Sequence, residues 1–180
     1  MRRCAIRLLM LALLPLAAPA AASAQEYDVL IRGGRIVDGT GNPWYYADIA
    51  VAGDRIAAVG DLSGMTARRI VDARGLYVAP GFIDVHSHAG GGLARAELSH
   101  ARPLLAQGIT TVFVNPDGGG PVDMAAQRED LLRHGLGVNV AQMVPHGSVR
   151  GAVVGSDDRA PTAAEMARMQ TLVRDGMAAG

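Results

Sequence analysis

Two histidines one residue apart stand at the end of a predicted strand. The strand is expected from Phe82 to His86, after Pro80-Gly81, and His88 follows before a glycine triplet. Alternate residues of a strand face the same side, so both imidazoles can point at one place. Neutral imidazole is a good ligand for zinc and similar divalent metals. The spacing predicts a metal site here, against the alternative of two ordinary polar residues.

Asp117 is the candidate for a third metal ligand. It comes two residues after a strand predicted from Ile109 to Asn115. The carboxyl ends of neighbouring parallel strands lie at the same end of a barrel, so this carboxylate could reach the two imidazoles. The alternative is a turn aspartate, because Pro-Asp-Gly is common in tight turns. Asp84 shares a strand face with the histidines and is expected either to orient an imidazole or to pair with an arginine.

The residues from 80 onward alternate predicted strands and helices, which is typical of parallel βα units. Besides the two strands above, we predict a strand at Gly137–Val144, helices at Leu93–Gln107 and Val122–His134, and a last helix after Pro161-Thr162, where Glu165 completes a capping box. A closed (β/α)₈ barrel takes about 250 residues. If these units begin such a barrel, it is incomplete in this chain.

The residues before 80 alternate short β-type runs with glycine turns. The predicted strands are Asp28–Ile31, Asp48–Ala52, Arg55–Val59 and Arg69–Val71. The intervening glycines can take backbone angles that other residues resist. Residues 25–79 are therefore predicted to form a small antiparallel β domain of the β-sandwich type, and residues 80–180 to form the βα units.

The first 24 residues have the three parts of a signal peptide. Arg2-Arg3 precede an apolar block that is too short to span a bilayer, and small residues follow up to Ala24. Cleavage after Ala24 predicts a periplasmic or secreted protein. It removes the one cysteine, Cys4, so no mature metal site can use a thiol. No later segment is long and apolar enough to serve as a membrane anchor.

Charge and composition exclude nucleic acid as the expected partner. The whole chain has 17 basic and 17 acidic residues, and the predicted signal peptide takes away arginines but no acid. The remaining arginines are scattered, and aromatic residues make up only 4% of the chain. A nucleic-acid surface would show a clustered basic face. A small molecule is the more fitting partner.

These motifs resemble the amidohydrolase superfamily, and among its branches the N-acyl-D-amino-acid deacylase (D-aminoacylase) family. The resemblance rests on Pro80–His88, on Gly34–Gly41, on Gly108–Thr111 and on His146–Arg150. It implies a TIM-like barrel, with His86 and His88 as ligands of zinc or another divalent metal.

The resemblance also implies a function and two further site residues. A full-length protein of this kind would be a metal-dependent hydrolase of non-peptide C–N bonds that deacylates N-acyl-D-amino acids. His146 would contact the substrate, and Arg150 could hold a substrate carboxylate at two points. The alternatives are a loop hydrogen bond for His146 and a structural salt bridge for Arg150. No catalytic residue is assigned, because the family's later histidines and aspartate are absent from these 180 residues. This polypeptide alone is expected to bind metal weakly and to be inactive.

Two departures from the family pattern leave the substrate and the metal number open. Ala89 and Gly90 stand where two acidic residues usually follow the histidine pair. The turn from Asn115 to Gly118 replaces an Asn-Cys-Gly turn whose cysteine binds metal. Two other functions therefore remain as alternatives. One is a cyclic-amide hydrolase of the dihydroorotase or hydantoinase type, and the other is an exported, non-catalytic metal-binding or interaction fragment.

Overall fold

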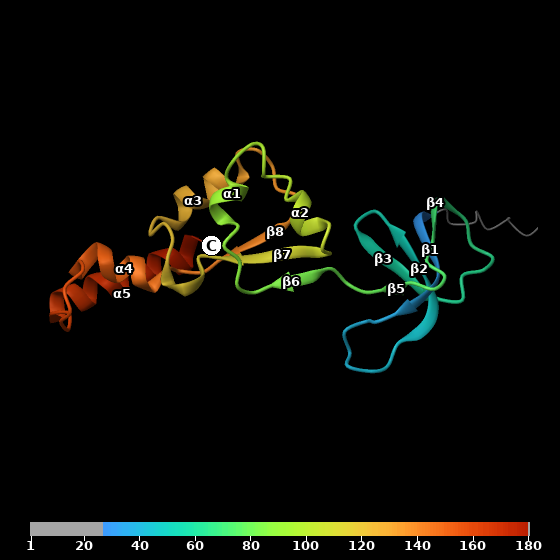
Figure 1. Cartoon of the computed structure of the whole chain (residues 1–180), viewed down its shortest axis with the longest axis horizontal. Helices are drawn as coiled ribbons and strands as arrows, with labels where there is room; N and C mark the ends of the chain where they lie inside the picture. The colour runs from blue at the N-terminus through green and yellow to red at the C-terminus, as the bar shows by residue number, and fades with distance from the viewer. Residues whose placement is uncertain (1–26, 180) are drawn as a thin grey trace, which may run out of the picture. The chain divides into compact units, whose positions relative to one another are not determined.

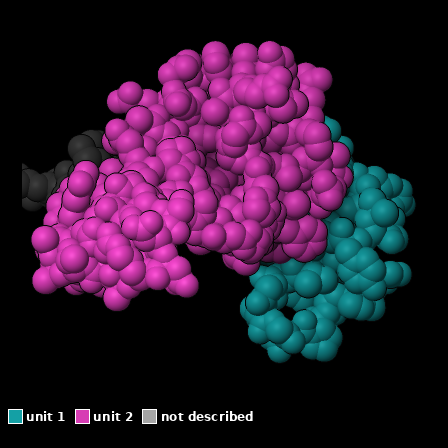
Figure 2. Space-filling model, turned by 60° about the vertical axis from the view of Figure 1, so that its left-hand side comes forward, with its two compact units in different colours: residues 1–78 teal, residues 79–180 magenta. Residues whose placement is uncertain are grey.

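The computed structural model describes residues 27–179, so the predicted signal peptide lies outside the described residues. The chain divides into two compact units between Val78 and Ala79, coloured separately in Figure 2. Strands and helices are both present, and the architecture is α/β. Between residues 27 and 179, no helix is both long and apolar enough to cross a membrane.

The first unit is a single sheet of five strands. They are β1 (Tyr27–Ile36), β2 (Tyr45–Ala52), β3 (Arg55–Gly60), β4 (Ala67–Asp72) and β5 (Tyr77–Val78). The order is β3-β2-β1-β4, and β5 also pairs with β1. Leu30 on β1 and Ala50 on β2 are fully buried, and Tyr27 and Leu62 complete this core.

The expectation of a purely antiparallel unit is wrong at β4 and β5. Strands β1, β2 and β3 pair antiparallel, but β4 and β5 both pair with β1 in parallel. A parallel pair needs a connection that crosses over the sheet. Here the chain leaves β3 at one edge and enters β4 at the other. Glycine turns in the sequence show where a strand stops, but not which edge the chain joins next.

The second unit contains three parallel strands in chain order. They are β6 (Phe82–Asp84), β7 (Ile109–Val114) and β8 (Asn139–Gln142). The parallel pairing confirms the βα pattern in the sequence. The helical segments are α1 (Gly90–Leu93), α2 (Arg102–Leu105), η1 (Pro116–Gly118), α3 (Met124–Leu132), α4 (His146–Val154) and α5 (Ala163–Ala179) (Figure 1).

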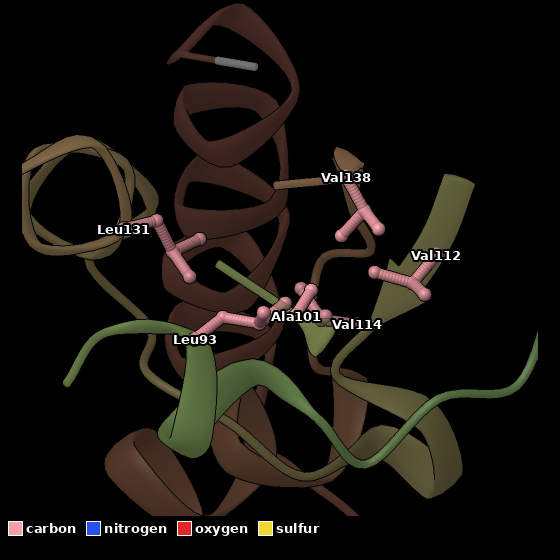
Figure 3. Close-up of a cluster of buried hydrophobic side chains, with 6 residues drawn as sticks. All are labelled: Leu93, Ala101, Val112, Val114, Leu131 and Val138. Carbon is pink, nitrogen blue, oxygen red and sulfur yellow. The ribbon is translucent and has the colours of Figure 1, made fainter. Parts of the chain in front are cut away.

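A compact apolar core joins the central strand to its helices. Six buried side chains form it, and they lie close together in Figure 3: Leu93, Ala101, Val112, Val114, Leu131 and Val138. Val112 and Val114 lie on β7 and are fully buried. Strand β7 is therefore anchored by its buried side chains. The loop that follows its carboxyl end starts from a well-packed strand.

The prediction of one helix at residues 93–107 is wrong, because most of this range is not helical. Helix α1 ends at Leu93, and α2 begins only at Arg102. Ala101 has φ +51°, which interrupts any helix, and Pro103 lies in the first turn of α2. Proline lacks an amide hydrogen and fits a first turn but not a helix interior. Apolar spacing alone therefore overestimated the length of this helix.

Candidate metal centre

The two histidines lie just past the end of β6. Asp84 pairs with Val112 of β7, and the amide of Ser87 donates to the carbonyl of Phe113 at 2.9 Å. Ser87 is buried at 5% exposure, whereas His86 and His88 on either side of it are exposed. The alternation predicted from the sequence therefore continues beyond the strand and turns both imidazoles toward solvent.

Asp84 positions the backbone of the first histidine. Its Oδ1 accepts a hydrogen bond from the amide of His86 at 3.1 Å. Among the described residues it forms no ion pair with an arginine, and no hydrogen bond joins it to an imidazole ring. Both expectations for Asp84 were therefore wrong, because the carboxylate closes a local turn two residues ahead of itself.

Asp117 sits in η1, a single turn directly after β7. Asn115 and Asp117, on either side of Pro116, both have left-handed backbones, with φ of +66° and +58°. Asparagine and aspartate visit this region more readily than other non-glycine residues, yet such strain still costs about 1–3 kcal/mol per residue. Strained backbones of this kind persist only where surrounding contacts hold them, and they concentrate at functional sites.

The turn brings the Asp117 carboxylate up to both histidines. Its Oδ2 lies 3.3 Å from Nε2 of His86 and 3.3 Å from Nε2 of His88. One ligand atom from each of the three side chains lies within 4.8 Å of the others. The side chains are 58%, 71% and 64% exposed for His86, His88 and Asp117. Among residues 27–179, this is the one such group of three or more potential ligands.

The two N–O spacings are compatible with a shared cation. A charge-assisted N–H···O bond is about 2.7–2.9 Å long. Two ligand atoms bound at ~2.0–2.1 Å to one tetrahedral zinc lie about 3.3–3.4 Å apart. The observed 3.3 Å matches the second distance. Two imidazoles and one carboxylate are also a ligand set that catalytic zinc uses.

A cleft of about 530 Å³ is lined by two of the three candidate ligands, His88 and Asp117. Gly90, Gly91 and Gly120 also line the cleft, and they have no side chains that would fill it. The glycine triplet after the histidine pair thus leaves room next to the candidate ligands. The volume is within the range of small-molecule sites.

Comparison with known families identifies the chain. The sequence pattern that defines the Amidohydrolase family matches residues 69–179, which include every candidate ligand. The chain belongs to the amidohydrolase family. This agrees with the resemblance carried by the strand before His86 and His88.

The relatives of this amidohydrolase include a D-aminoacylase and an N-acyl-D-glutamate deacylase. D-aminoacylase of Alcaligenes xylosoxydans xylosoxydans is 39% identical over 87% of this chain and 37% of its own length. A D-aminoacylase structure with a binuclear metal centre matches with a TM-score of 0.75 and 37% identity, over 86% of this chain and 37% of that one. N-acyl-D-glutamate deacylase from Bordetella bronchiseptica, complexed with zinc and a phosphonate inhibitor, matches with a TM-score of 0.75 and 36% identity, over 87% and 37%. The chain spans about a third of the length of these relatives.

His146 of this amidohydrolase lies near the Asp117 turn without joining the three candidate ligands. It was expected in a loop, but it begins α4 and is exposed. The next residue, Gly147, packs against Gly118, because a Cβ on Gly118 would lie 2.9 Å from the Gly147 nitrogen. The first turn of α4 therefore borders the site, and substrate contact by His146 stays a prediction.

Arg150 is occupied by backbone carbonyl groups. Its guanidinium donates to the carbonyls of Gly155, Asp157 and Arg159 at 3.1, 2.6 and 3.0 Å. These bonds tie α4 to the loop that follows it. Within the described part of the chain Arg150 forms no salt bridge. The structural role expected for it is therefore filled by hydrogen bonds to carbonyl groups and not by an ion pair. Its substrate contact stays a prediction.

Sequence reasoning missed the buried amides beneath the Asp117 turn. Asn115 follows the last residue of β7, Gln142 is the last residue of β8, and Gln127 on α3 forms hydrogen bonds with both. The signal was present, because polar residues at two neighbouring strand ends and on the buried face of a helix need partners. It was hidden because Gln127 lies in an otherwise ordinary helical pattern.

Proposed function

We propose that this chain supplies the first metal ligands of an amidohydrolase that deacylates N-acyl-D-amino acids. The observation that carries the proposal is the convergence of His86, His88 and Asp117 from the ends of two adjacent strands. The relatives named above act on such substrates, and this chain shares more than a third of the aligned residues with them. The activity belongs to a protein of the relatives' length, of which these residues are about a third.

The proposed cofactor is a divalent metal, and zinc is the preferred ion. The imidazoles of His86 and His88 and the carboxylate of Asp117 would hold it. When bound, such a cation polarises an amide carbonyl and makes hydroxide available at neutral pH. Asp84 fixes the backbone of His86, and the exposed faces of the three ligands leave an approach for the substrate.

The proposed complete fold is a (β/α)₈ barrel beside a small β-sandwich domain. Strands β6, β7 and β8 would be the first three barrel strands, because they are parallel and in chain order. The candidate ligands follow the carboxyl ends of β6 and β7, the face at which barrel enzymes place their sites. The five-stranded sheet of the first unit would contribute one layer of the sandwich.

The test uses protein expressed from the complete coding region that contains residues 1–180. We expect bound metal by elemental analysis and release of amino acid from N-acetyl-D-amino acids, with no release from the L-isomers. Chelation should abolish the activity, and zinc should restore it. His86→Ala should lower the rate at least 100-fold, whereas His100→Ala, a histidine outside the candidate site, should leave it unchanged. Hydrolysis of hydantoins or dihydropyrimidines instead of acyl amino acids would favour a cyclic-amide hydrolase.

We also propose export to the periplasm or the medium. The charged start, apolar block and small residues up to Ala24 support it. In the same expression, the N-terminal sequence of the exported protein should begin at Gln25. Protein that stays in the cytoplasm and begins at Met1 would contradict export.

A further inference from the structure

A closed set of amide hydrogen bonds lies directly beneath the turn that carries Asp117. The side-chain amides of Asn115 and Gln127 bond each other in both directions, each at 2.8 Å. Both residues are only 8% exposed. Asn115 also donates to the carbonyl of Met143 at 3.0 Å, and Gln142 donates to Oε1 of Gln127 at 2.7 Å. The set therefore joins the ends of β7 and β8 to α3.

This arrangement depends on an amide at position 127. The Gln127 side chain donates through Nε2 and accepts through Oε1, and the bond from Gln142 fixes which end accepts. A carboxylate could not donate to Asn115, and an apolar side chain could do neither. The burial of the pair makes an unsatisfied partner expensive.

The turn is fastened to Asn115 on both sides of Asp117. Asn115 itself has φ +66°, and this sets the direction in which the chain enters the turn. Three residues after Asp117, the chain folds back over the same side chain, because a Cβ on Gly120 would lie 2.5 Å from Oδ1 of Asn115. Gly118 rests against Gly147. Asp117 thus sits on a short loop whose two ends meet at one buried amide.

We propose that Gln127 is a positioning residue that acts through Asn115 to hold the Asp117 carboxylate opposite His86 and His88. Gln127 lies on α3 and is not one of the three candidate ligands. Its contribution is to keep Asn115 in the left-handed conformation from which the turn starts. The effect of Gln127 on metal binding rests on the proposed metal site. The left-handed conformation of Asn115 is present in the structure without a metal.

The first test measures Co²⁺ affinity by visible absorption. It uses purified protein expressed from the complete coding region that contains residues 1–180. Gln127→Met keeps the length of the side chain and removes its hydrogen bonds. We expect it to weaken Co²⁺ binding about 10-fold or more, in the range seen when a partner of a metal ligand is lost. The matched control is Gln107→Met, because Gln107 makes one exposed bond to the carbonyl of Pro103 at 2.9 Å. The control should bind Co²⁺ as the unmodified protein does.

A double variant separates positioning from a general loss of structure. Asp117→Ala alone should weaken Co²⁺ binding, and adding Gln127→Met to it should cause no further loss, because the positioned group is already gone. An equal additional loss in the Asp117→Ala background would overturn the proposal. So would Gln127→Met protein that binds Co²⁺ normally.

The second test needs no metal. NMR measurement of φ at Asn115 and Asp117 should give positive values in the unmodified protein. In Gln127→Met, we expect the positive φ to be lost at Asn115 and, with it, at Asp117. Circular dichroism verifies that the variant is folded. If the unmodified protein binds no Co²⁺, the proposed metal function falls, while the φ measurement still decides the positioning role. An unchanged Asp117 turn in the variant would refute that role.

Discussion

At the scale of single residues, the candidate site depends on one carboxylate oxygen that faces two imidazole nitrogens. Oδ2 of Asp117 is 3.3 Å from each Nε2, a separation that suits ligands sharing a cation. No thiol is needed for this arrangement. As a metal ligand, this carboxylate would take the place of the cysteine in the family pattern, and it would be a harder donor.

Replacing Asp117 by asparagine tests whether this residue is a ligand or an ordinary turn residue. Asparagine also tolerates positive φ, so the turn should persist and the free energy of unfolding should change by no more than about 0.5 kcal/mol. A neutral amide is a poor metal ligand, so zinc affinity, measured by competition with a chelator, should fall at least 10-fold. Asp158→Asn, an exposed acid on the loop before α5, is the matched control. Unchanged zinc affinity in Asp117→Asn would restore the plain turn interpretation.

The sequence predicted which three side chains come together, but not the backbone conformation that aligns them. The two histidines could be found because a strand has a period of two residues, which is a local property. The left-handed Asn115 could not, because its hydrogen-bond partner Gln127 is 12 residues away. Which distant amide meets a strand end depends on how α3 packs on the sheet, and single-sequence patterns do not contain that information.

At the scale of elements, the same division between local and distant causes applies. The capping box at the start of α5 was predicted and is present, because Thr162 and Glu165 bond each other over three residues. The parallel β4 was not predicted, since its pairing depends on the path between strands. Elements that are set by neighbouring residues could be read from the sequence, whereas sheet order could not.

The capping box should make the stability of α5 depend on pH. Hydrogen bonds from Arg159, and then from Thr162, hold the pKa of the Glu165 carboxyl well below its usual range. A lowered pKa in the folded state means that ionised Glu165 stabilises the fold above its unfolded pKa, and that this contribution is lost as the pH falls toward the folded value. In thermal unfolding, Glu165→Gln should lower the Tm most at pH 7, and the difference should shrink below about pH 4.

The matched control for this measurement is Glu129→Gln. Glu129 is an exposed acid on α3, and within the described chain it has no ion-pair or hydrogen-bond partner for its side chain. Its replacement should change the Tm little at either pH. A Glu165→Gln difference that is the same at pH 7 and pH 3 would show that the charge of Glu165 does not act on the cap.

At the scale of the whole molecule, each unit has a core of its own. Leu30 and Ala50 are fully buried within the first sheet, and Val112 and Val114 within the second unit. The candidate ligands all belong to the second unit. Damage to the first core should therefore leave the geometry of the ligands intact.

Leu30→Ala tests this independence. Removing a fully buried leucine side chain leaves a cavity and should reduce the stability of the first unit by about 2–5 kcal/mol. We expect hydrogen exchange to speed up in β1, β2 and β4 but not in β7, because the helices and strands that protect β7 are in its own unit. Co²⁺ affinity should stay within about twofold of the unmodified protein. If exchange rises equally in β7 and metal binding weakens with it, the two units unfold together, and the first sheet is then a structural requirement of the metal site.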